Sequence, residues 1–469
     1  MDCTERQEWE TAMKTELKNI EENKTWKLVP RPTDSKVLDV KWVFKKKPDT
    51  YRARLFVKGF QQVDFSLENM YSPVARAETL KILLAYCHHN NLCIHQMDVE
   101  TAFLNGKIRS EVYVKQPPGF EDGTNKVFKL EKSLYGLNES PKTWYDTFYN
   151  YVLEIGFVRS KHDSCLFFKL TDDHKVVYIL IFVDDLLICS DLKEVMKTKA
   201  KLASRFKMKD LGPVKNYVGI TVNYNFENKR GDMTLSQVSY IESLAKKYQI
   251  EDYKLYATPM EEKLQLQPAE EPNSDLKFRN VLGALLYISS ASRPAISFAV
   301  NYLSRFQNSY NNTHFRYALR ILKYLYLTKN LKLTFKKNPG AEILGCNVDS
   351  DWAGDRTDRR STSGYVIRLY GNLVLWKTKK QSTVTKSSTF AEYVALSELV
   401  SEILYIKEIL VSFNTIIRNP VNIYEDNSSV IDIAKNGNFT KNSKHIEIQY
   451  HFVNEKGITA IKKLRLKKM

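Results

Sequence analysis

Apolar and polar residues alternate along this chain with two periodicities, one typical of helices and one typical of strands. Apolar residues that recur every three or four positions predict helices over residues 6–26, 79–87, 236–250, 279–294 and 390–410. Apolar or alternating runs rich in Val, Ile, Tyr and Phe predict strands over residues 40–60 (two strands and a Pro-Asp turn), 92–99, 176–190, 341–352, 362–370, 372–380 and 421–426. Because both kinds of element occur throughout, we predict a mixed α/β (α+β) fold.

The periodic pattern breaks most clearly over residues 259–280, where Pro, Glu and Ser are frequent. This composition is typical of a linker. A second strand-rich unit starts near Ala341. A chain of 469 residues is long enough for about two to four domains, so we expect the linker to separate folded parts.

Two adjacent acids interrupt the apolar run VVYILIFVDDLLICSD. An ionised carboxylate that leaves water without a partner costs several kcal/mol. We predict a hairpin with Asp184 and Asp185 as its two-residue tip, which would project both acids at one end. A solvated tip with two harmless acids is the alternative. A third acid, Asp98, ends the apolar strand LCIHQMDV, and three carboxylates at strand ends would suit Mg²⁺.

The composition of the chain predicts which class of partner it binds. The net charge of +17 attracts polyanions, with nucleic acid as the first candidate and an anionic membrane as the second. The six Cys are scattered without a C-x-x-C pair, which argues against a zinc knuckle and a disulfide framework. We expect no signal peptide at the polar start, and no apolar run approaches the ~20 residues of a membrane span.

Seven stretches of the sequence, taken in order, resemble the reverse transcriptase of copia-type LTR retrotransposons. They are KWVFKKK…YRARLFVKGFQQ, YSPVARAETLKILLA, HQMDVETAFLNG, VYVKQPPGF, LEKSLYGLNESPKTWYD, FVDDLLI and YVGI. The resemblance implies a right-hand polymerase, with fingers, palm and the start of the thumb over residues 1–258 and a helical thumb or connection over 259–340. It implies that Asp98, Asp184 and Asp185 hold two Mg²⁺ ions, or Mn²⁺, for nucleotidyl transfer.

The same resemblance implies roles at the incoming nucleotide. Phe103 lies five residues after Asp98, where related polymerases place an aromatic ring that blocks a ribose 2′ oxygen. Ordinary core packing is the alternative for this residue. Arg52, Arg54 and Lys58 are candidates for binding the triphosphate or template phosphates through charge-assisted contacts. A solvated basic strand face would explain each of them as well.

A second set of acids occurs in NVDSDWAGD, SSTFAEYVALSE and VNIYEDNSS. This order resembles the RNase H domain that follows the polymerase in the same polyprotein, here over residues 341–469. The resemblance implies a mixed sheet with flanking helices that cuts RNA in RNA–DNA hybrids with two metal ions. It selects Asp349, Glu392 and Asp426 as catalytic and metal-binding residues. Asp351 lies on the same strand face as Asp349 and is a competitor.

Some positions depart from the family's pattern. In LYGLNESP, Asn138 and Glu139 replace Lys and Gln, which we expect to place a negative charge near bound nucleic acid. Glu447 stands where the family usually has Asp, and we find no fourth RNase H acid after it. We therefore expect a C-terminally truncated RNase H domain with weak hybrid cleavage.

The sequence thus predicts an RNA-directed DNA polymerase with an impaired RNase H domain. Its expected partners are an RNA template, a DNA primer, the RNA–DNA hybrid and dNTPs, without a membrane. The expected location is the cytoplasm, in virus-like particles, or the nucleus. One alternative is a catalytically inactive remnant that binds nucleic acid through its positive charge. A folded translation product without function is another.

Overall fold

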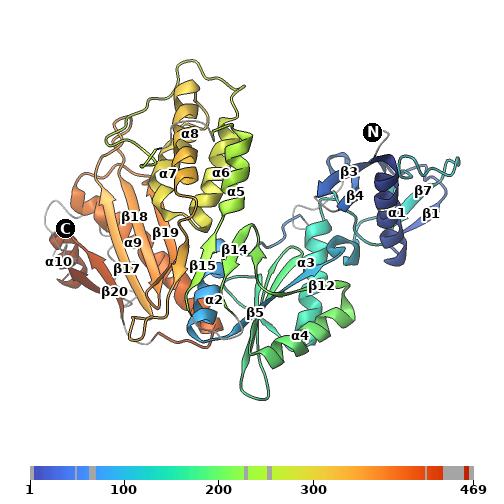
Figure 1. Ribbon diagram of the computed structural model, residues 1–469, viewed down its shortest axis with the longest axis horizontal. Coiled ribbons are helices and arrows are strands. Elements are labelled where there is room, and N and C mark those ends of the chain that lie inside the picture. Colours follow the sequence, from blue (N-terminus) through green and yellow to red (C-terminus); the bar gives the residue numbers. More distant parts are fainter. Residues whose placement is uncertain are drawn as a thin grey trace. The chain divides into compact units, whose positions relative to one another are not determined.

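The computed structural model describes residues 5–47, 50–62, 70–225, 231–250, 256–417, 420–436 and 459–463 (Figure 1). By compactness the chain divides into two units. The first comprises residues 1–75 and 95–212, and the second comprises residues 76–94 and 213–469. The predicted domain boundaries near residues 258 and 340 differ from this division and stay a prediction. Both units contain helices and strands, which confirms the predicted mixed α/β class.

The first unit starts with a helix and continues with short strands and further helices. Its elements are α1 (Arg6–Glu22), β1 (Trp26–Val29), β2 (Val37–Leu38), β3 (Val40–Lys47), β4 (Thr50–Val57), η2 (Gly59–Gln61), β5 (Cys93–Val99), η4 (Ala102–Asn105), β6 (Tyr113–Val114), β7 (Val127–Leu130), α3 (Ser140–Glu154), β8 (Val158–Arg159), β9 (Leu166–Leu170), β10 (Val176–Phe182), β11 (Asp185–Ser190), α4 (Leu192–Arg205) and β12 (Met208–Pro213). Strands β3 and β4 form the predicted basic hairpin, and β1, β7, β6 and β2 form a separate sheet.

A six-stranded sheet with the order β12-β5-β11-β10-β9-β8 carries the first set of acids. Strands β10 and β11 pair antiparallel, with Phe182 opposite Asp185. The hairpin tip therefore consists of Val183 and Asp184, and the prediction of an Asp184–Asp185 tip was wrong by one residue. Val183 has a φ of 59°, and its carbonyl accepts a hydrogen bond of 2.6 Å from Nε1 of the buried Trp144. This long-range contact holds a β-branched residue in the left-handed region that such residues avoid.

Two glycines allow two backbone segments of the first unit to meet. A Cβ added to Gly59 would lie 2.1 Å from the carbonyl oxygen of Gly136, and one added to Gly136 would lie 2.2 Å from that of Val57. Gly136 also has a φ of 93°, which favours glycine. The Val57 amide donates to the Tyr135 carbonyl at 2.7 Å. The close approach therefore fixes the end of β4 against the loop that carries Tyr135.

We expect Gly136→Ala to lower the free energy of unfolding by about 3 kcal/mol, from about 1–2 kcal/mol for the left-handed backbone and a similar amount for overpacking. The shift of the urea midpoint measures this loss. Gly123→Ala is a matched control, because Gly123 has a φ of 77° and open space around its added Cβ. Equal losses in the two variants would show that the close approach adds nothing.

The second unit combines a helical part with two sheets. Its elements are α2 (Ala77–His89), β13 (Asn216–Tyr217), β14 (Ile220–Asn223), β15 (Met233–Ser236), α5 (Val238–Lys247), α6 (Phe278–Ala291), η5 (Pro294–Ile296), α7 (Ser297–Ser304), α8 (Asn312–Leu327), β16 (Leu333–Phe335), β17 (Leu344–Asp351), β18 (Thr362–Leu369), β19 (Asn372–Lys380), α9 (Ser388–Ser412), β20 (Val421–Glu425), α10 (Ser428–Asn436) and β21 (Thr459–Lys463). Helices α5 to α8 share one hydrophobic core.

The segment before α6 has no helix or strand over residues 256–277, as a linker would. It is nevertheless tied to the helical part. The amide of Leu266 donates to the Tyr302 hydroxyl at 2.7 Å, and the amide of Ala269 donates to the Ser309 carbonyl at 3.1 Å. The predicted linker is therefore an irregular strap that packs along the helices rather than a free connection.

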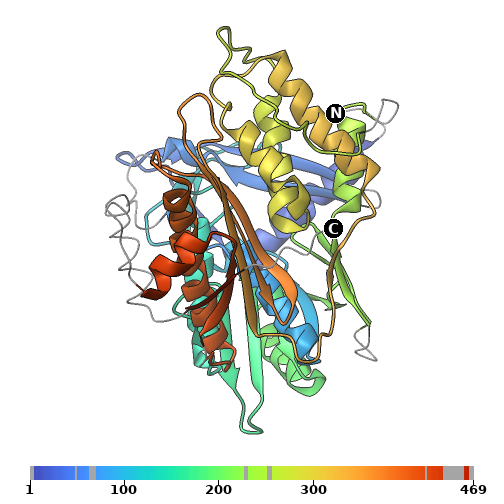
Figure 2. The same cartoon turned by 90° about the vertical axis from the view of Figure 1, so that its left-hand side faces the viewer.

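A five-stranded mixed sheet with the order β19-β18-β17-β20-β21 carries the second set of acids. Strands β19, β18 and β17 are antiparallel, whereas β20 and β21 run parallel to β17. Helix α9 packs along β17 and β18, as Figures 1 and 2 show. The Ser387 hydroxyl caps this helix by accepting a hydrogen bond of 3.1 Å from the amide of Phe390. The cap fixes the first turns of α9 at the end of β17.

The cysteines in the described part of the chain are free thiols buried in the two units, at positions 87, 93, 165, 189 and 346. Of the helices that the described residues form, none is both long enough and apolar enough to cross a membrane.

Candidate catalytic sites

Three acids meet at one edge of the six-stranded sheet. Asp98 lies near the end of β5, Asp184 at the hairpin tip, and Asp185 at the start of β11. The amide of Val99 donates to the carbonyl of Asp184 at 2.9 Å, which joins the strand end to the tip. All three acids are half-buried. The structure therefore brings together the three residues that the sequence selected.

Burial and mutual repulsion oppose the ionisation of these acids. Burial raises the pKa of Asp98, and the charge of Asp184 raises it further, whereas two arginines of β4 lower it. Burial raises the pKa of Asp185 to about 6, and the charges of Asp184 and Asp98 add to the effect. A bound cation would relieve this repulsion, and carboxylate oxygens are the ligands that Mg²⁺ prefers. The residues present thus fit a magnesium site.

Gln96 is a site residue that the sequence analysis missed. It is 5% exposed, and its Nε2 donates to Oδ1 of Asp185 at 3.2 Å. Gln96 and Asp98 are two residues apart on β5, so they lie on the same face of the strand. A polar residue two positions before the acid, and so on the same face of the strand, was the available signal. Its hydrogen bond orients Asp185.

A cavity of about 760 Å³ lies beside Asp98. Helix α1 and strand β4 supply most of its lining, including Arg52 and Arg54 from β4. The Arg54 guanidinium stacks over the ring of Tyr135, 4.3 Å from its centroid. Both arginines are close enough to lower the pKa of Asp98 by their charge. Asp98 and two guanidinium groups therefore face one cavity, an arrangement suited to a triphosphate that carries a metal ion.

Lys58 and Phe103 do not line this cavity. The Lys58 ammonium lies 3.3 Å from Oδ2 of Asp39, and Lys115 lies 2.7 Å from the other oxygen. Hydrogen bonds from Lys115, Gln61 and Lys58, in that order of effect, hold the pKa of Asp39 well below its usual range. Phe103 is half-buried and packs edge-on against Tyr135, with ring centroids 5.3 Å apart. Its link to the cavity is therefore indirect.

The side chain of Glu139 lies in the interior of the first unit. Glu139, expected to place a negative charge near bound nucleic acid, is 4% exposed. Its carboxylate accepts hydrogen bonds from the Arg109 amide at 3.4 Å and from the Ser110 hydroxyl. Asn138 turns its amide group to the Gly59 carbonyl at 3.3 Å. The carboxylate of Glu139 is therefore used inside the fold.

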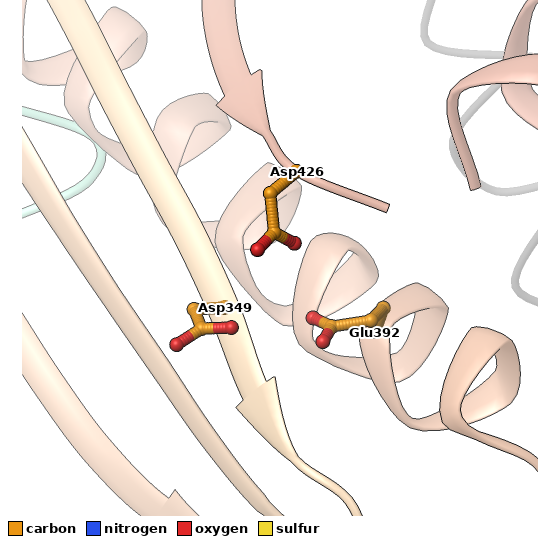
Figure 3. Close-up of side chains that lie close together, drawn as sticks. All are labelled: Asp349, Glu392 and Asp426. Carbon is orange, nitrogen blue, oxygen red and sulfur yellow. The ribbon is translucent and has the colours of Figure 1, made fainter. Parts of the chain in front are cut away.

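The second set of acids converges in the second unit. Asp349 comes from β17, Glu392 from α9, and Asp426 follows β20. Each offers an oxygen, and these oxygens lie within 4.8 Å of one another. Figure 3 shows the three carboxylates gathered between the strand and the helix. Within the described residues, no other group of three His, Cys, Asp or Glu side chains is as tight.

Asp351, the sequence competitor of Asp349, is not part of this group. Burial raises its pKa, and the charge of Arg305 lowers it. Together with Arg305 it lines a different cavity of about 350 Å³. Glu447 and the segment in which we looked for a fourth acid lie outside the described residues.

Glu425 is the second site residue that the sequence analysis missed. It ends β20, whose burial alternates, so that Val421, Ile423 and Glu425 all face inward. Burial, followed by the charge of Glu425, raises the pKa of Glu392 to about 8. One oxygen of each glutamate is buried without a hydrogen-bond partner among the described residues. A set of hard oxygen donors with unsatisfied buried atoms fits a divalent cation such as Mg²⁺.

Comparison with known proteins places the chain in a family. A family model described as reverse transcriptase (RNA-dependent DNA polymerase) matches residues 23–262. The chain is 34% identical over 464 residues to the retrovirus-related Pol polyprotein from transposon TNT 1-94 of Nicotiana tabacum, covering 95% of this chain and 34% of that protein. It is 36% identical over 462 residues to the polyprotein from transposon RE1 of Arabidopsis thaliana, covering 95% and 31%. The chain thus spans about a third of the length of these relatives.

A shorter relative matches over its whole length. The chain is 35% identical over 314 residues to a putative transposon Ty5-1 protein of Saccharomyces cerevisiae, covering 66% of this chain and 100% of that protein. A solved foamy viral protease-reverse transcriptase is 11% identical with a TM-score of 0.28, covering 98% of this chain and 70% of that one. From the family model and the full-length match, the chain belongs to the reverse transcriptase family, among the Pol polyproteins of copia-type retrotransposons.

Proposed function

We propose that this chain is an RNA-directed DNA polymerase that extends a DNA primer on an RNA template with dNTPs. The observation that carries the proposal is the edge of three acids, one of which, Asp98, lines a cavity of about 760 Å³ together with Arg52 and Arg54. Asp98, Asp184 and Asp185 would hold two Mg²⁺ ions, or Mn²⁺. When bound, these ions supply Lewis-acid activation of the primer hydroxyl and neutralise the leaving pyrophosphate.

The protein's own groups would position the reactants. We propose that Arg52 and Arg54 bind the triphosphate in the cavity that they share with Asp98. Gln96 holds Asp185 in place through its hydrogen bond of 3.2 Å. Phe103 supports Tyr135 at the cavity wall, and through that ring we propose that it excludes a ribose 2′ oxygen. Lys58 then serves to hold Asp39 rather than the nucleotide.

We expect Arg52→Ala to raise the KM for dNTP by about 10- to 100-fold, because a hydrogen bond to a charged group is worth about 1.5–3 kcal/mol. Steady-state primer extension at varied dNTP concentration measures this change. Lys58→Ala removes an equal charge from the same basic segment and is the matched control, with an expected KM within about twofold of wild type. A larger effect at Lys58 than at Arg52 would show that the assignment is reversed.

A second proposed activity is cleavage of RNA in RNA–DNA hybrids. The group of Asp349, Glu392 and Asp426 within 4.8 Å favours it. These acids would hold two metal ions that activate the attacking water. RNA–DNA hybrid would then be a substrate of the second unit as well as a product of synthesis.

Primer extension by the purified chain, on an RNA template with Mg²⁺ and dNTPs, tests the main proposal. Elongation of the primer is the expected result. Salt-sensitive binding of the same template and primer without elongation would instead support an inactive nucleic-acid-binding remnant. We propose cytoplasmic virus-like particles, or the nucleus, as the place of action, in line with the polyprotein family.

A further inference from the structure

A second cavity of the first unit, called the basic cavity here, is lined mainly by basic side chains. Its volume of about 600 Å³ falls within the range of ligand sites. Its cations come from β1, from the end of α4 and from the segments that follow α1, η4 and β7. None of the acids proposed for polymerisation lines it. The cations are Lys24, Lys27, Lys107, Lys132 and Arg205, and the acids are Glu131 and Glu154.

Most cations of the basic cavity have no acidic partner. Lys27 lies 3.2 Å from a carboxylate oxygen of Glu131. The other four form no ion pair within the part of the chain that the structure describes. Lys132 is half-buried, and burial, followed by the charges of Arg205 and Lys24, lowers the pKa of its ammonium group. Like charges held together in this way repel one another, and a bound anion would relieve the repulsion.

The basic cavity adjoins the cavity beside Asp98, called the polymerase cavity here. Asn105 lines the basic cavity, and its Nδ2 donates to the carbonyl of Thr101 at 2.9 Å. Thr101 in turn lines the polymerase cavity. Helix α1 and its end show the same relation, because Asn19 lines the polymerase cavity and Lys24 lines the basic cavity. At both places a short stretch of backbone separates the two cavities.

A row of exposed cations leads from one cavity to the other. Arg205 lines the basic cavity, and Lys209 lines the polymerase cavity. Lys207 lies between them in the sequence, and all three side chains are exposed, whereas the intervening Phe206 is buried. Lys207 also lies 3.6 Å from Glu100, in an exposed ion pair of the kind that contributes little. Positive charge therefore continues along the surface between the two cavities.

Cations that are spread over a cavity and a row suit a ligand with a repeated negative charge. A sugar–phosphate backbone has one charge per nucleotide, and Lys and Arg side chains bind its phosphates without regard to sequence. A single phosphate would use only part of this arrangement. A double helix is too wide for a cavity of about 600 Å³, whereas a few nucleotides of one strand fit.

We propose that the basic cavity binds the backbone of single-stranded RNA next to the polymerase cavity. The inference rests on the proposed polymerase activity and deepens it, because it assigns a place to RNA that is not paired with the primer. The strand is either the unpaired stretch of the template or a separate RNA. Its phosphates are the groups recognised in both cases.

Fluorescence anisotropy of a labelled oligouridylate tests the proposal on the full chain. EDTA prevents both extension and cleavage, and an excess of unlabelled, blunt-ended RNA–DNA hybrid occupies the polymerase cavity. We expect the oligouridylate to bind under these conditions, and Lys132→Ala with Arg205→Ala to weaken its binding by about tenfold. The slope of log affinity against log salt concentration should fall by about 1.4, at about 0.7 for each phosphate contact of a single strand.

Two matched double variants make this result specific. Lys161→Ala with Lys193→Ala removes the same charge from exposed positions of the first unit outside the basic cavity, and should change the affinity by less than about twofold. Lys107→Ala with Arg205→Ala alters only exposed cations of the basic cavity. It should weaken binding to a similar extent, and it decides the question if the half-buried Lys132 cannot be replaced without unfolding.

A second measurement identifies the strand, with primer–templates that carry a long or a short unpaired template stretch. Tighter binding of the long form, lost in Lys132→Ala with Arg205→Ala, shows that the template occupies the basic cavity. Equal binding of both forms, with the oligouridylate still bound, shows that a separate RNA occupies it.

The proposal would be overturned by oligouridylate binding that the hybrid abolishes, or that Lys132→Ala with Arg205→Ala leaves within about twofold of wild type. Primer extension by the wild-type chain would stand in that case. Failure of the wild-type chain to extend a primer would instead refute the polymerase proposal and leave the binding results unchanged. The two failures are therefore distinguishable.

Discussion

Replacing Asp185 by Asn is expected to reduce primer extension by about 10³-fold or more while the protein remains folded. A metal ion contributes several kcal/mol of charge stabilisation in the transition state, and about 4 kcal/mol corresponds to 10³-fold in rate. Asn has the size of Asp but lacks the negative charge that a divalent cation requires. Gln96 can still donate its hydrogen bond to the Asn carbonyl, so the geometry of the strand end is preserved. Gel analysis of extended primers measures the loss.

The free energy of unfolding distinguishes a loss of catalysis from a loss of folded structure in Asp185→Asn. The pKa of Asp185 is raised to about 6, above the value near 3.8 of an unfolded aspartate, mainly by burial. The folded state therefore prefers the protonated form, and the ionised form destabilises it as pH rises through that interval. Asp185→Asn should accordingly be at least as stable as wild type at pH 7. Asp173→Asn, at an exposed position in the turn between β9 and β10, is the activity control. Undiminished extension by Asp185→Asn would refute the assignment.

Most elements of the fold could be predicted because each buries one face. The periodicity of α1 and the alternation of β4 follow from that requirement. The hairpin tip was misplaced by one residue because Trp144, distant in the sequence, holds the Val183 carbonyl. The strap over residues 256–277 was predicted as a linker because its partners lie on helices that composition does not reveal. Local pattern predicts elements well, and long-range hydrogen bonds set their details.

The site residues that belong to family motifs could be predicted from the sequence. Motif order selected Asp98, Asp184 and Asp185, and the structure brings them together. It also selected Lys58, which turns to Asp39, because a motif does not state which way a flexible side chain points. Gln96 and Glu425 were missed, although Gln96 lies in a strand that is buried almost throughout and Glu425 lies on the buried face of an alternating strand. A buried polar residue on the face of a catalytic acid is a signal that motif matching ignores.

Glu392→Gln is expected to reduce hybrid cleavage by about 10³-fold and to leave primer extension within about twofold of wild type. The reason for the first effect is the loss of one charged ligand from the group within 4.8 Å, with the same several kcal/mol at stake as at the polymerase site. The reason for the second is that none of the acids proposed for polymerisation is altered. Cleavage of an RNA strand labelled at its 5′ end and annealed to DNA measures the first effect. Glu402→Gln, on the same helix, is the control.

The pH dependence of the free energy of unfolding is a second measurement that should distinguish Glu392→Gln from wild type. Burial and the charge of Glu425 raise the pKa of Glu392 to about 8, from the 4.5 of an unfolded glutamate. The folded state thus binds more protons than the unfolded state between these values, and stability falls as pH rises from about 4.5 to 8. In the presence of a chelator, wild type should lose more stability than Glu392→Gln between pH 5 and about pH 8.5, by urea unfolding. Parallel pH profiles would show that Glu392 ionises normally in the fold, and retained cleavage would show that the second site does not depend on it.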